Sequence, residues 1–486
     1  MITMKLIYLS FKTIIMQFLK KYFVPLLIFL FVLSYFLSSP IEGFLRKNIP
    51  EKIYLRMSWA KSILTRQDFG FYKYEIRLGD QFEEIYNYIN NEDFQFSLKE
   101  KRLNDEISSF KIPPLFPAQD IDRTNLAYID FFKNDLIYAS KNGVFFKVAI
   151  DNQKADFTPI KSNLYQFFEK KIIEKRASIN YFNPLTISKF GIKDILVDNN
   201  FLYLSYVENI NENNYNTSII RSQISDSLVF QKFYSSLGGV SSDYEEFYPI
   251  QSGGRIVKFK QDSLLLSVGD FRKRTEAQNT ESNIGKIIAI SKKDGGSRIV
   301  SIGHRNPQGL DYSQVGNYII STDHGPAGGD EINLNVFPND QINFGWPIAS
   351  YGVHYFVDAA NDDGHGGDVN RVINNAPIYK SHSEYGFEEP IKYYEISPGI
   401  SEVKFIKSNK NKFEFIVSTL GTHDTIKKPF MNHLIHYKYD LIDRNLTTVK
   451  KHFVGERVRD LIVSKSLKKL FFTGETTGII GYMDLK

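Results

Sequence analysis

The feature that most constrains the fold of this 486-residue chain is a series of short apolar runs separated by turn residues. From Asn125 onward, runs rich in β-branched and aromatic residues recur at close intervals, and many pair as hairpins. These runs are 135–140, 144–150, 201–207, 217–224, 254–259, 263–270, 286–291, 318–322, 413–419, 434–439 and 470–475. No long helical pattern interrupts them, so the periodicity predicts an all-β domain, either a sandwich or a propeller.

The composition agrees with an all-β chain and argues against several functions. Aromatic residues make up 15% of the chain, with 40 Phe and 29 Tyr, which favours strands over helical bundles. The net charge of +5 is small for this length and argues against a nucleic-acid-binding protein. Because the chain has no cysteine, it has no disulfide, thiolate metal site or cysteine nucleophile; this is compatible with export but does not establish it.

The N-terminal part has a different character. Residues 22–39 form an uncharged apolar run, preceded by lysines, that covers most of a ~30 Å hydrocarbon layer. We expect an uncleaved transmembrane anchor, with residues 1–21 in the cytoplasm and the remainder on the periplasmic or extracytoplasmic side; a cleaved signal peptide and a buried core helix are the alternatives. Residues 40–122 mix charges with spaced apolar residues, so we expect short helices and a small amphipathic hairpin that form a small, mostly helical stalk before a domain at 123–486.

The most distinctive stretch is 302–347, in which glycine and proline separate polar residues. It contains IGHRNPQGL, then TDHGPAGGDEINL, and finally NFGWP. Glycine lets the backbone approach a bound group closely, and proline restricts the backbone around it. The stretch therefore predicts loops shaped to hold a ligand, although similar punctuation separates strands in any all-β protein.

These three phrases, in this order and spacing, resemble the soluble PQQ-dependent sugar dehydrogenases, the glucose/sorbosone dehydrogenase family. The resemblance is close over 302–347, fair over about 125–486 and absent before that. It implies a six-bladed β-propeller that uses PQQ and Ca²⁺ to transfer a hydride from C1 of an aldose. It also implies a small sugar as substrate, and the anchor would place the protein near a respiratory electron acceptor.

The resemblance assigns roles to residues within these phrases. Arg305 offers a planar cationic guanidinium and Asn306 an amide, which suit hydrogen bonds to a quinone oxygen and a sugar hydroxyl. The resemblance therefore implies that both residues are catalytic and bind the cofactor. Gly325 and Pro326 match the residues whose backbone carbonyls bind the calcium that seats PQQ. The histidine before them, His324, is expected to be a hydrogen-bonded loop residue.

Further charged residues have two interpretations each. Arg457 and Arg459 lie two residues apart and would point to one face of a strand. They resemble the family's Arg-x-Arg-Asp, whose arginines contact the PQQ carboxylates; a solvated charged strand is the alternative. Asp330 and Glu331 would order their loop, form salt bridges or bind an ion nearby. The acidic, glycine-rich loop 358–368 is either a solvated turn or a calcium loop.

Two departures from the family pattern concern catalysis. The family's proton-accepting histidine lies four residues before an arginine, and in this chain Gln251 holds that position before Arg255. An amide cannot accept a proton near neutral pH, and loss of a placed general base costs about 10²–10⁴-fold in rate. Gly421 stands where the family often has a lysine near PQQ, with His423 two residues on.

Three functions are therefore open. The first is a membrane-anchored PQQ-dependent sugar dehydrogenase. The second is a catalytically impaired propeller that binds a carbohydrate or a protein partner, since a fold does not fix an activity. The third is a calcium-dependent lactone hydrolase on a related propeller, which would need a His-Asp or His-His pair that the sequence does not display.

Overall fold

The computed structural model describes residues 95–113, 125–164, 191–354, 373–421 and 432–485, except for positions 142, 152, 212 and 245. All of them belong to one compact unit, Ile85–Ile173 together with Thr186–Lys486. The anchor predicted at 22–39, most of the predicted stalk, the loop 358–368 and His423 lie outside the described residues. Among the described residues, no helix is long and apolar enough to span a membrane.

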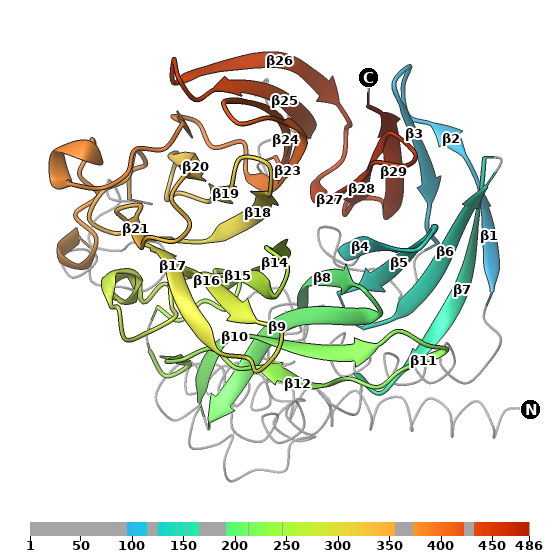
Figure 1. Ribbon diagram of the computed structural model, residues 1–486, viewed down its shortest axis with the longest axis horizontal. Helices are drawn as coiled ribbons and strands as arrows, with labels where there is room; N and C mark the ends of the chain where they lie inside the picture. Colours follow the sequence, from blue (N-terminus) through green and yellow to red (C-terminus); the bar gives the residue numbers. More distant parts are fainter. Residues whose placement is uncertain are drawn as a thin grey trace, which may run out of the picture. The chain divides into compact units, whose positions relative to one another are not determined.

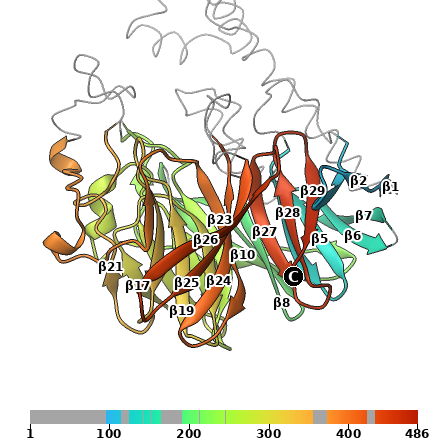
Figure 2. The same cartoon turned by 90° about the horizontal axis from the view of Figure 1, so that it is seen from above.

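The described strands form six sheets arranged as blades around a common axis (Figure 1). Within each blade, antiparallel strands lead outward from an innermost strand, and blades 1 and 3 add a short parallel strand, β11 and β21, at the outside. Seen edge-on, the strands run through the thickness of the ring (Figure 2). The predicted six-bladed, all-β propeller is confirmed, and each run predicted as a strand lies on an observed strand.

Blade 1 contains β4 (Ala127–Phe132), β5 (Asp135–Ser140), β6 (Phe145–Asp151), β7 (Lys154–Ser162), β1 (Phe96–Lys99) and β11 (Ser227–Leu228). Blade 2 contains β8 (Ile192–Asp198), β9 (Phe201–Asn211), β10 (Asn214–Gln223), β12 (Gln231–Tyr234) and β13 (Val240–Ser241). Blade 3 contains β14 (Gly253–Phe259), β15 (Ser263–Val268), β16 (Lys286–Ser291), β17 (Ser297–Ile302) and β21 (Ile342–Asn343).

Blade 4 contains β18 (Pro307–Ser313), β19 (Tyr318–Asp323), β20 (Asp330–Asn335) and β22 (Lys392–Tyr394). Blade 5 contains β23 (Ile400–Ser408), β24 (Lys412–Thr419), β25 (His433–Asp440) and β26 (Asn445–Phe453). Blade 6 contains β27 (Val458–Ser464), β28 (Lys469–Gly474), β29 (Ile479–Asp484), β3 (Ile107–Lys111) and β2 (Lys101–Arg102). Two short 3₁₀ helices are η1 (Arg274–Gln278) and η2 (Ser383–Tyr385).

The central strands of the blades are apolar on both faces because each blade packs between two others. In β15, with sequence SLLLSV, every residue after the first is buried. One apolar cluster joins Tyr203 of blade 2 to Leu266 of blade 3, and another joins Ile320 of blade 4 to Phe413 of blade 5. Burial on both faces explains why the sequence shows continuous apolar runs rather than strict alternation.

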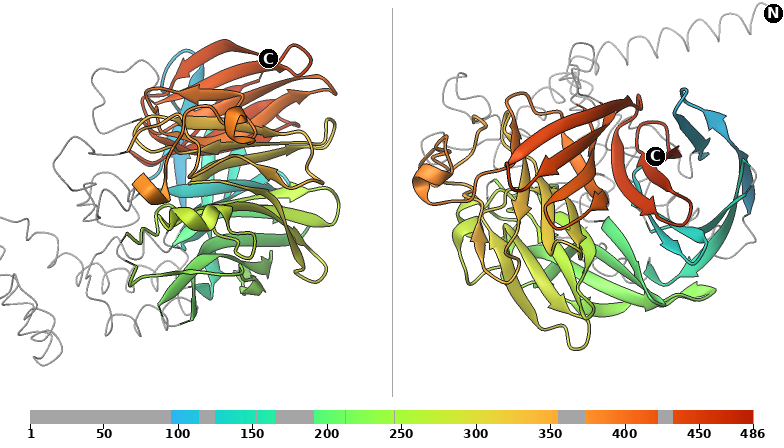
Figure 3. Two further views of the ribbon diagram at one scale, coloured as in Figure 1. Left: turned by 90° about the vertical axis from the view of Figure 1, so that its left-hand side faces the viewer. Right: turned by 45° about the horizontal axis from the view of Figure 1, so that its top comes forward.

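The innermost strands form a closed ring, and an N-terminal strand completes blade 6. Each innermost strand contacts the next, in the order β4, β8, β14, β18, β23, β27 and back to β4. The C-terminal strand β29 pairs with β3, so strands from the two ends of the described chain lie side by side (Figure 3). Blade 1 likewise gains β1, which pairs with β7.

This closure corrects part of the prediction for residues 40–122. The described part of that range, 95–113, was expected to belong to a stalk of short helices and a small amphipathic hairpin. It instead forms β1, β2 and β3 of the propeller, of which β2 and β3 pair antiparallel. Ile107, Phe110 and Ile112 are almost completely buried there. The prediction was wrong for this stretch because only a few apolar residues stand among many charges, and their partners lie at the far end of the chain.

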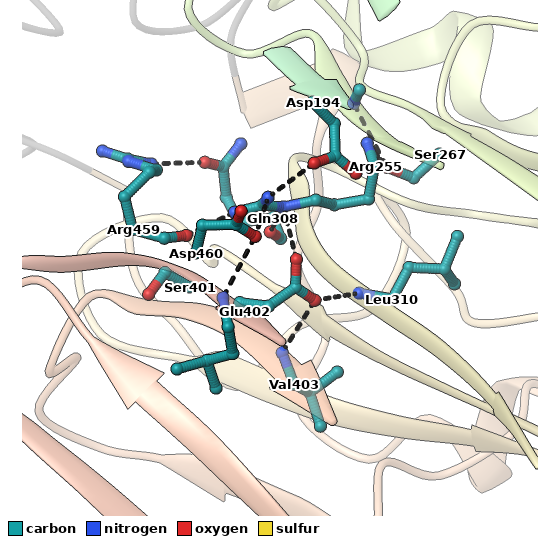
Figure 4. A network of polar contacts seen from close by, with 12 residues as sticks. Asp194, Arg255, Ser267, Gln308, Leu310, Ser401, Glu402, Val403, Arg459 and Asp460 are labelled. Carbon is teal, nitrogen blue, oxygen red and sulfur yellow. Dashed lines mark hydrogen bonds and ion pairs between the residues drawn. The ribbon is translucent and has the colours of Figure 1, made fainter. Parts of the chain in front are cut away.

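A buried polar network occupies the centre of the ring (Figure 4). The guanidinium of Arg255 on β14 lies 3.2 Å from Asp194 of blade 2, 3.0 Å from Asp460 of blade 6 and 2.9 Å from Glu402 of blade 5. All four side chains are nearly inaccessible to solvent. One arginine thus connects four blades, and its charge offsets part of the cost of burying the carboxylates.

A second contact recurs between neighbouring innermost strands. In four blades, an aspartate Oδ2 accepts a hydrogen bond from a backbone N–H of the next blade. The pairs are Asp130 with Val197 (2.6 Å), Asp194 with Ile256 (2.8 Å), Asp311 with Phe405 (2.7 Å) and Asp460 with Ile129 (2.8 Å). Burial raises the pKa of Asp130 and of Asp460, each to about 6. The carboxylates therefore link neighbouring blades, although burying their negative charge is unfavourable.

Candidate active site

The candidate site residues gather at one end of the ring because of the strand order. Within a blade, the innermost strand begins at this end and the antiparallel second strand ends there. Loops and strand ends from blades 3, 4 and 6 therefore meet at the same face of the propeller. Those at the starts of innermost strands are Gln251, Arg305, Asn306, Arg457 and Arg459, and those at the ends of second strands are Asp270, Asp323, His324 and Glu475.

The loop that carries Arg305 and Asn306 is fixed by Asp323, the last residue of β19. The backbone N–H groups of Arg305 and Asn306 donate to the Asp323 carboxylate at 3.2 and 2.6 Å. The ring of His304 lies 3.1 Å from the same carboxylate. Gly303 precedes the loop with φ +77°, and a Cβ there would lie 2.6 Å from a neighbouring backbone nitrogen. The loop is thus held by backbone bonds, so the side chains of Arg305 and Asn306 are not needed to hold it and contact other parts of the site.

Gln251 lies between Arg305 and Asp270. With its amide oriented to satisfy both neighbours, the nitrogen donates to Asp270 Oδ1 and the oxygen accepts from Arg305 Nη2, each at 3.0 Å. Arg305 also donates to the carbonyl of His324 at 2.9 Å, and Trp346 Nε1 donates to Asp270 at 2.9 Å. Burial raises the pKa of Asp270, whereas the charge of Arg305 opposes that rise.

Asn306 connects the start of blade 3 to blade 6. Its Oδ1 accepts hydrogen bonds from the Gly253 N–H at 3.3 Å and from Gln308 Nε2 at 2.9 Å. Gln308 in turn accepts from Arg459 Nη1 at 2.9 Å, as Figure 4 shows. The sequence phrases around 305 and 459, which are far apart in the chain, therefore meet in one hydrogen-bonded network.

Arg457 and Arg459 share one buried carboxylate, that of Glu475. Arg457 Nε lies 2.7 Å from Glu475 Oε1, and Arg459 Nε lies 2.9 Å from Glu475 Oε2. Burial acts to raise the pKa of Glu475, but Arg459 and Arg457 outweigh it and hold the pKa below its ordinary value. Arg457 also donates to the carbonyls of Leu420 and Gly421, so Gly421, which the resemblance aligns with a lysine, lies beside this pair.

Gly325 and Pro326 lie in the loop between β19 and β20, which Asp330 orders. The Asp330 carboxylate accepts from Gly325 N at 3.2 Å, from Ser397 Oγ at 2.8 Å and from Ile400 N at 3.1 Å. In the part of the chain that the structure describes, the carbonyl oxygens of Gly325 and Pro326 accept no hydrogen bond. The described residues contain no cluster of three metal-binding side chains, so an ion here would depend on these carbonyls.

The neighbouring residues His324 and Glu331 are engaged in protein contacts. His324 Nε2 lies against the carbonyl of Ile400, and burial lowers the pKa of His324. Arg459 and Arg305 both contribute to this lowering, which agrees with a position between the two arginines. Glu331 lies 3.4 Å from Nε2 of the buried His382 and so forms an ion pair when that ring is protonated.

Sequence reasoning did not single out four residues that organise the site. Asp270, Asp323 and Glu475 each position an arginine or its loop, and Gln308 bridges Asn306 and Arg459. The only sequence signal was that the three acidic residues stand at the ends of apolar runs, where a buried strand reaches the surface of the sheet. That signal indicates an edge position but not the partner.

Fold and site together define a six-bladed propeller with arginines, amides and uncommitted backbone carbonyls gathered at one mouth. The family model of the glucose/sorbosone dehydrogenases matches residues 185–480, which is more than half of the chain. The chain therefore belongs to the glucose/sorbosone dehydrogenase family.

Individual relatives are more distant. Aldose sugar dehydrogenase YliI of Escherichia coli is 27% identical over 242 residues, which cover 45% of this chain and 58% of that protein, less than two thirds of its length. A crystal structure of a glucose dehydrogenase has a TM-score of 0.53 at 19% identity and covers 74% of this chain and 96% of its own. The apo form of the soluble aldose sugar dehydrogenase of Escherichia coli has a TM-score of 0.54 at 18% identity, covering 81% and 100%. At 19% and 18% identity, the likeness to these two structures shows a shared fold alone.

Proposed function

We propose that this protein is a PQQ-dependent sugar dehydrogenase, in which C1 of an aldose gives up a hydride to the quinone. The supporting observation is that Gln308 joins Asn306 to Arg459, while the adjacent Arg305 donates to the His324 carbonyl, next in the chain to the free carbonyls of Gly325 and Pro326. When bound, PQQ supplies the quinone that accepts the hydride. Family membership and the likeness to an aldose sugar dehydrogenase support the same reaction class.

The residues present fit such a cofactor and metal. Arg457 and Arg459 share the single negative charge of Glu475, which leaves one positive charge for an anionic ligand. Carbonyl oxygens such as those of Gly325 and Pro326 are hard donors of the kind that Ca²⁺ prefers. Arg305 is held at their side by its bond to the His324 carbonyl and would bind an oxygen atom of the ligand.

Removal of the sugar hydroxyl proton is the step for which the chain is poorly equipped. Gln251 cannot accept a proton near neutral pH. Asp270 contacts Gln251, but both of its carboxylate oxygens already accept hydrogen bonds, one from Arg272 N at 2.8 Å and one from Trp346. We therefore propose that the protein turns over slowly unless another group takes the place of the histidine.

The hydrogen bonding of Gln251 also favours a second candidate function, which is ligand binding without catalysis. Because Gln251 is bonded on both sides, its position is well ordered for binding but not for proton transfer. A propeller with this site would bind PQQ, a carbohydrate or a protein partner without catalysis. Binding without turnover distinguishes this function from the first.

We also propose that residues 22–39 anchor the protein in a membrane, with the propeller on the periplasmic or extracytoplasmic side. The support is the apolar run itself and the lysines before it. Such an anchor would keep the propeller close to a respiratory electron acceptor. Protease protection of the propeller in intact cells, and its loss after the outer barrier is opened, would test this arrangement.

A titration of the full-length protein with PQQ tests the main proposal. Trp346 is one of two tryptophans in the chain, and the guanidinium of Arg305 lies 5.4 Å from its ring centre, so its fluorescence should report binding. We expect saturable quenching that weakens strongly when Ca²⁺ is chelated, together with dye reduction on aldoses. Quenching without dye reduction supports the binding function, and no quenching with Ca²⁺ present contradicts PQQ binding.

A further inference from the structure

The guanidinium of Arg272 is held differently from those of the other arginines around the site. It makes no hydrogen bond or ion pair with any residue of the described part of the chain. Instead it lies over the ring of Tyr248, 4.0 Å from the ring centre. By contrast, Arg457 and Arg459 are paired with Glu475, and Arg274 is paired with Glu246.

The backbone holds Arg272 in this place despite unfavourable dihedral angles. Phe271 and Arg272 have φ values of +52° and +68°, in the left-handed region that side-chain-bearing residues rarely adopt. The Phe271 N–H donates to the Gln251 carbonyl at 2.9 Å, and the Arg272 N–H donates to Asp270 at 2.8 Å. The buried Phe271 ring also stacks on Phe247. Two consecutive residues of this kind persist only where the surroundings impose them, which is common at binding sites.

The backbone of Arg272 lies next to the residues that the proposed function assigns to the substrate. Its N–H contacts Asp270, which contacts Gln251, the residue at the position where the family's proton acceptor meets the sugar hydroxyl. The arginine pair proposed for PQQ lies in blade 6, whereas Arg272 follows β15 of blade 3. Burial and the charge of Arg305 both act against protonation of Arg272, so the pKa of its guanidinium is lowered. A bound anion would relieve that repulsion.

We propose that Arg272 binds an anionic group of the substrate, so that the preferred substrate is an aldose carrying a carboxylate or phosphate rather than a neutral sugar. This inference rests on the proposed function of the same site. A guanidinium presents parallel N–H donors that match both anions in a bidentate arrangement. The contact with the Tyr248 ring restricts the guanidinium and so reduces the entropy lost on binding.

Calorimetry on the full-length protein without PQQ, in buffer with Ca²⁺, tests the proposal directly. The probes are D-glucuronate, D-glucose 6-phosphate and D-glucose, which separate a carboxylate from a phosphate preference. We expect at least one anionic sugar to bind tenfold or more tightly than glucose. Arg272→Gln should reduce that preference by about 10- to 100-fold, the usual range for a hydrogen bond to a charged group. Arg272→Lys should keep part of it because the charge remains.

A matched control is Arg221→Gln, since Arg221 lies over the ring of Phe233 at 4.7 Å but belongs to β10. This variant should bind all three sugars as the wild type does, and thermal unfolding should show that both variants are folded. Equal affinity of the wild type for all three sugars, or a preference that survives in Arg272→Gln, overturns the proposal. So does a loss of PQQ affinity in Arg272→Gln with the sugar preference unchanged, which would place Arg272 at the cofactor. Failure of the wild type to bind PQQ contradicts the proposed function but leaves this sugar test intact.

Discussion

The side-chain amide of Gln251, which the resemblance aligns with the family's proton acceptor, donates a hydrogen bond to Asp270 at 3.0 Å. The amide oxygen is bonded to Arg305, so Gln251 is fixed on both sides. A histidine here could donate one ring N–H to Asp270 and keep its other nitrogen free to accept a proton. The surroundings of a general base are thus present without the base itself.

Replacing Gln251 with histidine should therefore raise turnover. A placed general base contributes about 10²–10⁴-fold, and we expect a gain of that order in steady-state dye reduction with saturating PQQ and Ca²⁺. Gln251→Met is the matched control, because it keeps the side-chain length without adding a base, and it should not gain activity. If Gln251→His binds PQQ and sugar normally but is no faster than wild type, proton removal is not what limits the enzyme.

Asp330 should control the metal affinity of the loop that carries Gly325 and Pro326. It accepts three hydrogen bonds from this loop and the start of blade 5, so Asp330→Ala releases the backbone that presents the carbonyls. We expect Ca²⁺ affinity, measured by competition with a chelator, to fall about tenfold or more, as for other residues that position metal ligands. Asp340→Ala, at an exposed position, should leave it unchanged. Unchanged affinity in Asp330→Ala would locate the calcium elsewhere.

Glu475→Gln should destabilise the propeller. The carboxylate is 1% exposed and serves two arginines, so its loss leaves two poorly compensated charges. Removing one partner of a buried pair costs about 3–5 kcal/mol, and we expect about 2–4 kcal/mol because both arginines keep some contact with water. Urea unfolding at neutral pH would measure the loss, with the exposed Glu384→Gln as control.

The difference in unfolding free energy between wild type and Glu475→Gln should change with pH in a defined direction. Since the folded-state pKa of Glu475 lies below its ordinary value of 4.5, the carboxylate stabilises the fold above that pH. The stabilisation is lost as pH falls through the folded-state pKa. The difference in unfolding free energy between wild type and Glu475→Gln should therefore shrink in acid, and a difference that grows in acid would contradict the pairing.

How much of this structure could be predicted from the sequence depends on how far apart in the chain two contacting residues lie. A run such as SLLLSV at 263–268 is apolar on both faces, so its strand could be recognised from its own residues. Arg305 could be assigned because a short local phrase carries it. The pairing of Arg255 with Asp460 could not be predicted, because the two residues are 205 positions apart and meet only once the ring closes. The same holds for Arg459 and Gln308.

Asp130 should show the opposite pH dependence to Glu475. Burial raises its folded-state pKa from 3.8 to about 6, so stability falls as pH rises between these values. The loss amounts to about 3 kcal/mol, at ~1.4 kcal/mol for each pKa unit. Asp130→Asn keeps an oxygen for the Val197 N–H but cannot ionise, and should therefore gain stability over wild type as pH rises from 4 to 7. The exposed Asp226→Asn should follow wild type in urea unfolding across this range. Parallel curves for wild type and Asp130→Asn would show that Asp130 carries no raised pKa.

Completion of blade 6 by β3 makes the start of the folded domain testable. A chain that begins at residue 123, the boundary predicted from sequence, lacks β3 and leaves the edge of β29 unpaired. Such an edge invites association, so we expect this chain to aggregate or unfold at lower temperature than one that begins at residue 85, where the compact unit starts.

A point substitution separates the effect of losing the β3–β29 strand pairing from the effect of losing a buried side chain of β3. Phe110 is 0% exposed and pairs with Ile480, so Phe110→Ala in the longer chain should cost about 3–5 kcal/mol in urea unfolding. Lys111→Ala, on the exposed neighbouring residue, should cost little. If the two chain lengths were equally stable and Phe110→Ala were silent, blade 6 would be complete without its N-terminal strand. Because β27 of that blade carries Arg459 and β28 leads to Glu475, opening the blade should also weaken PQQ binding.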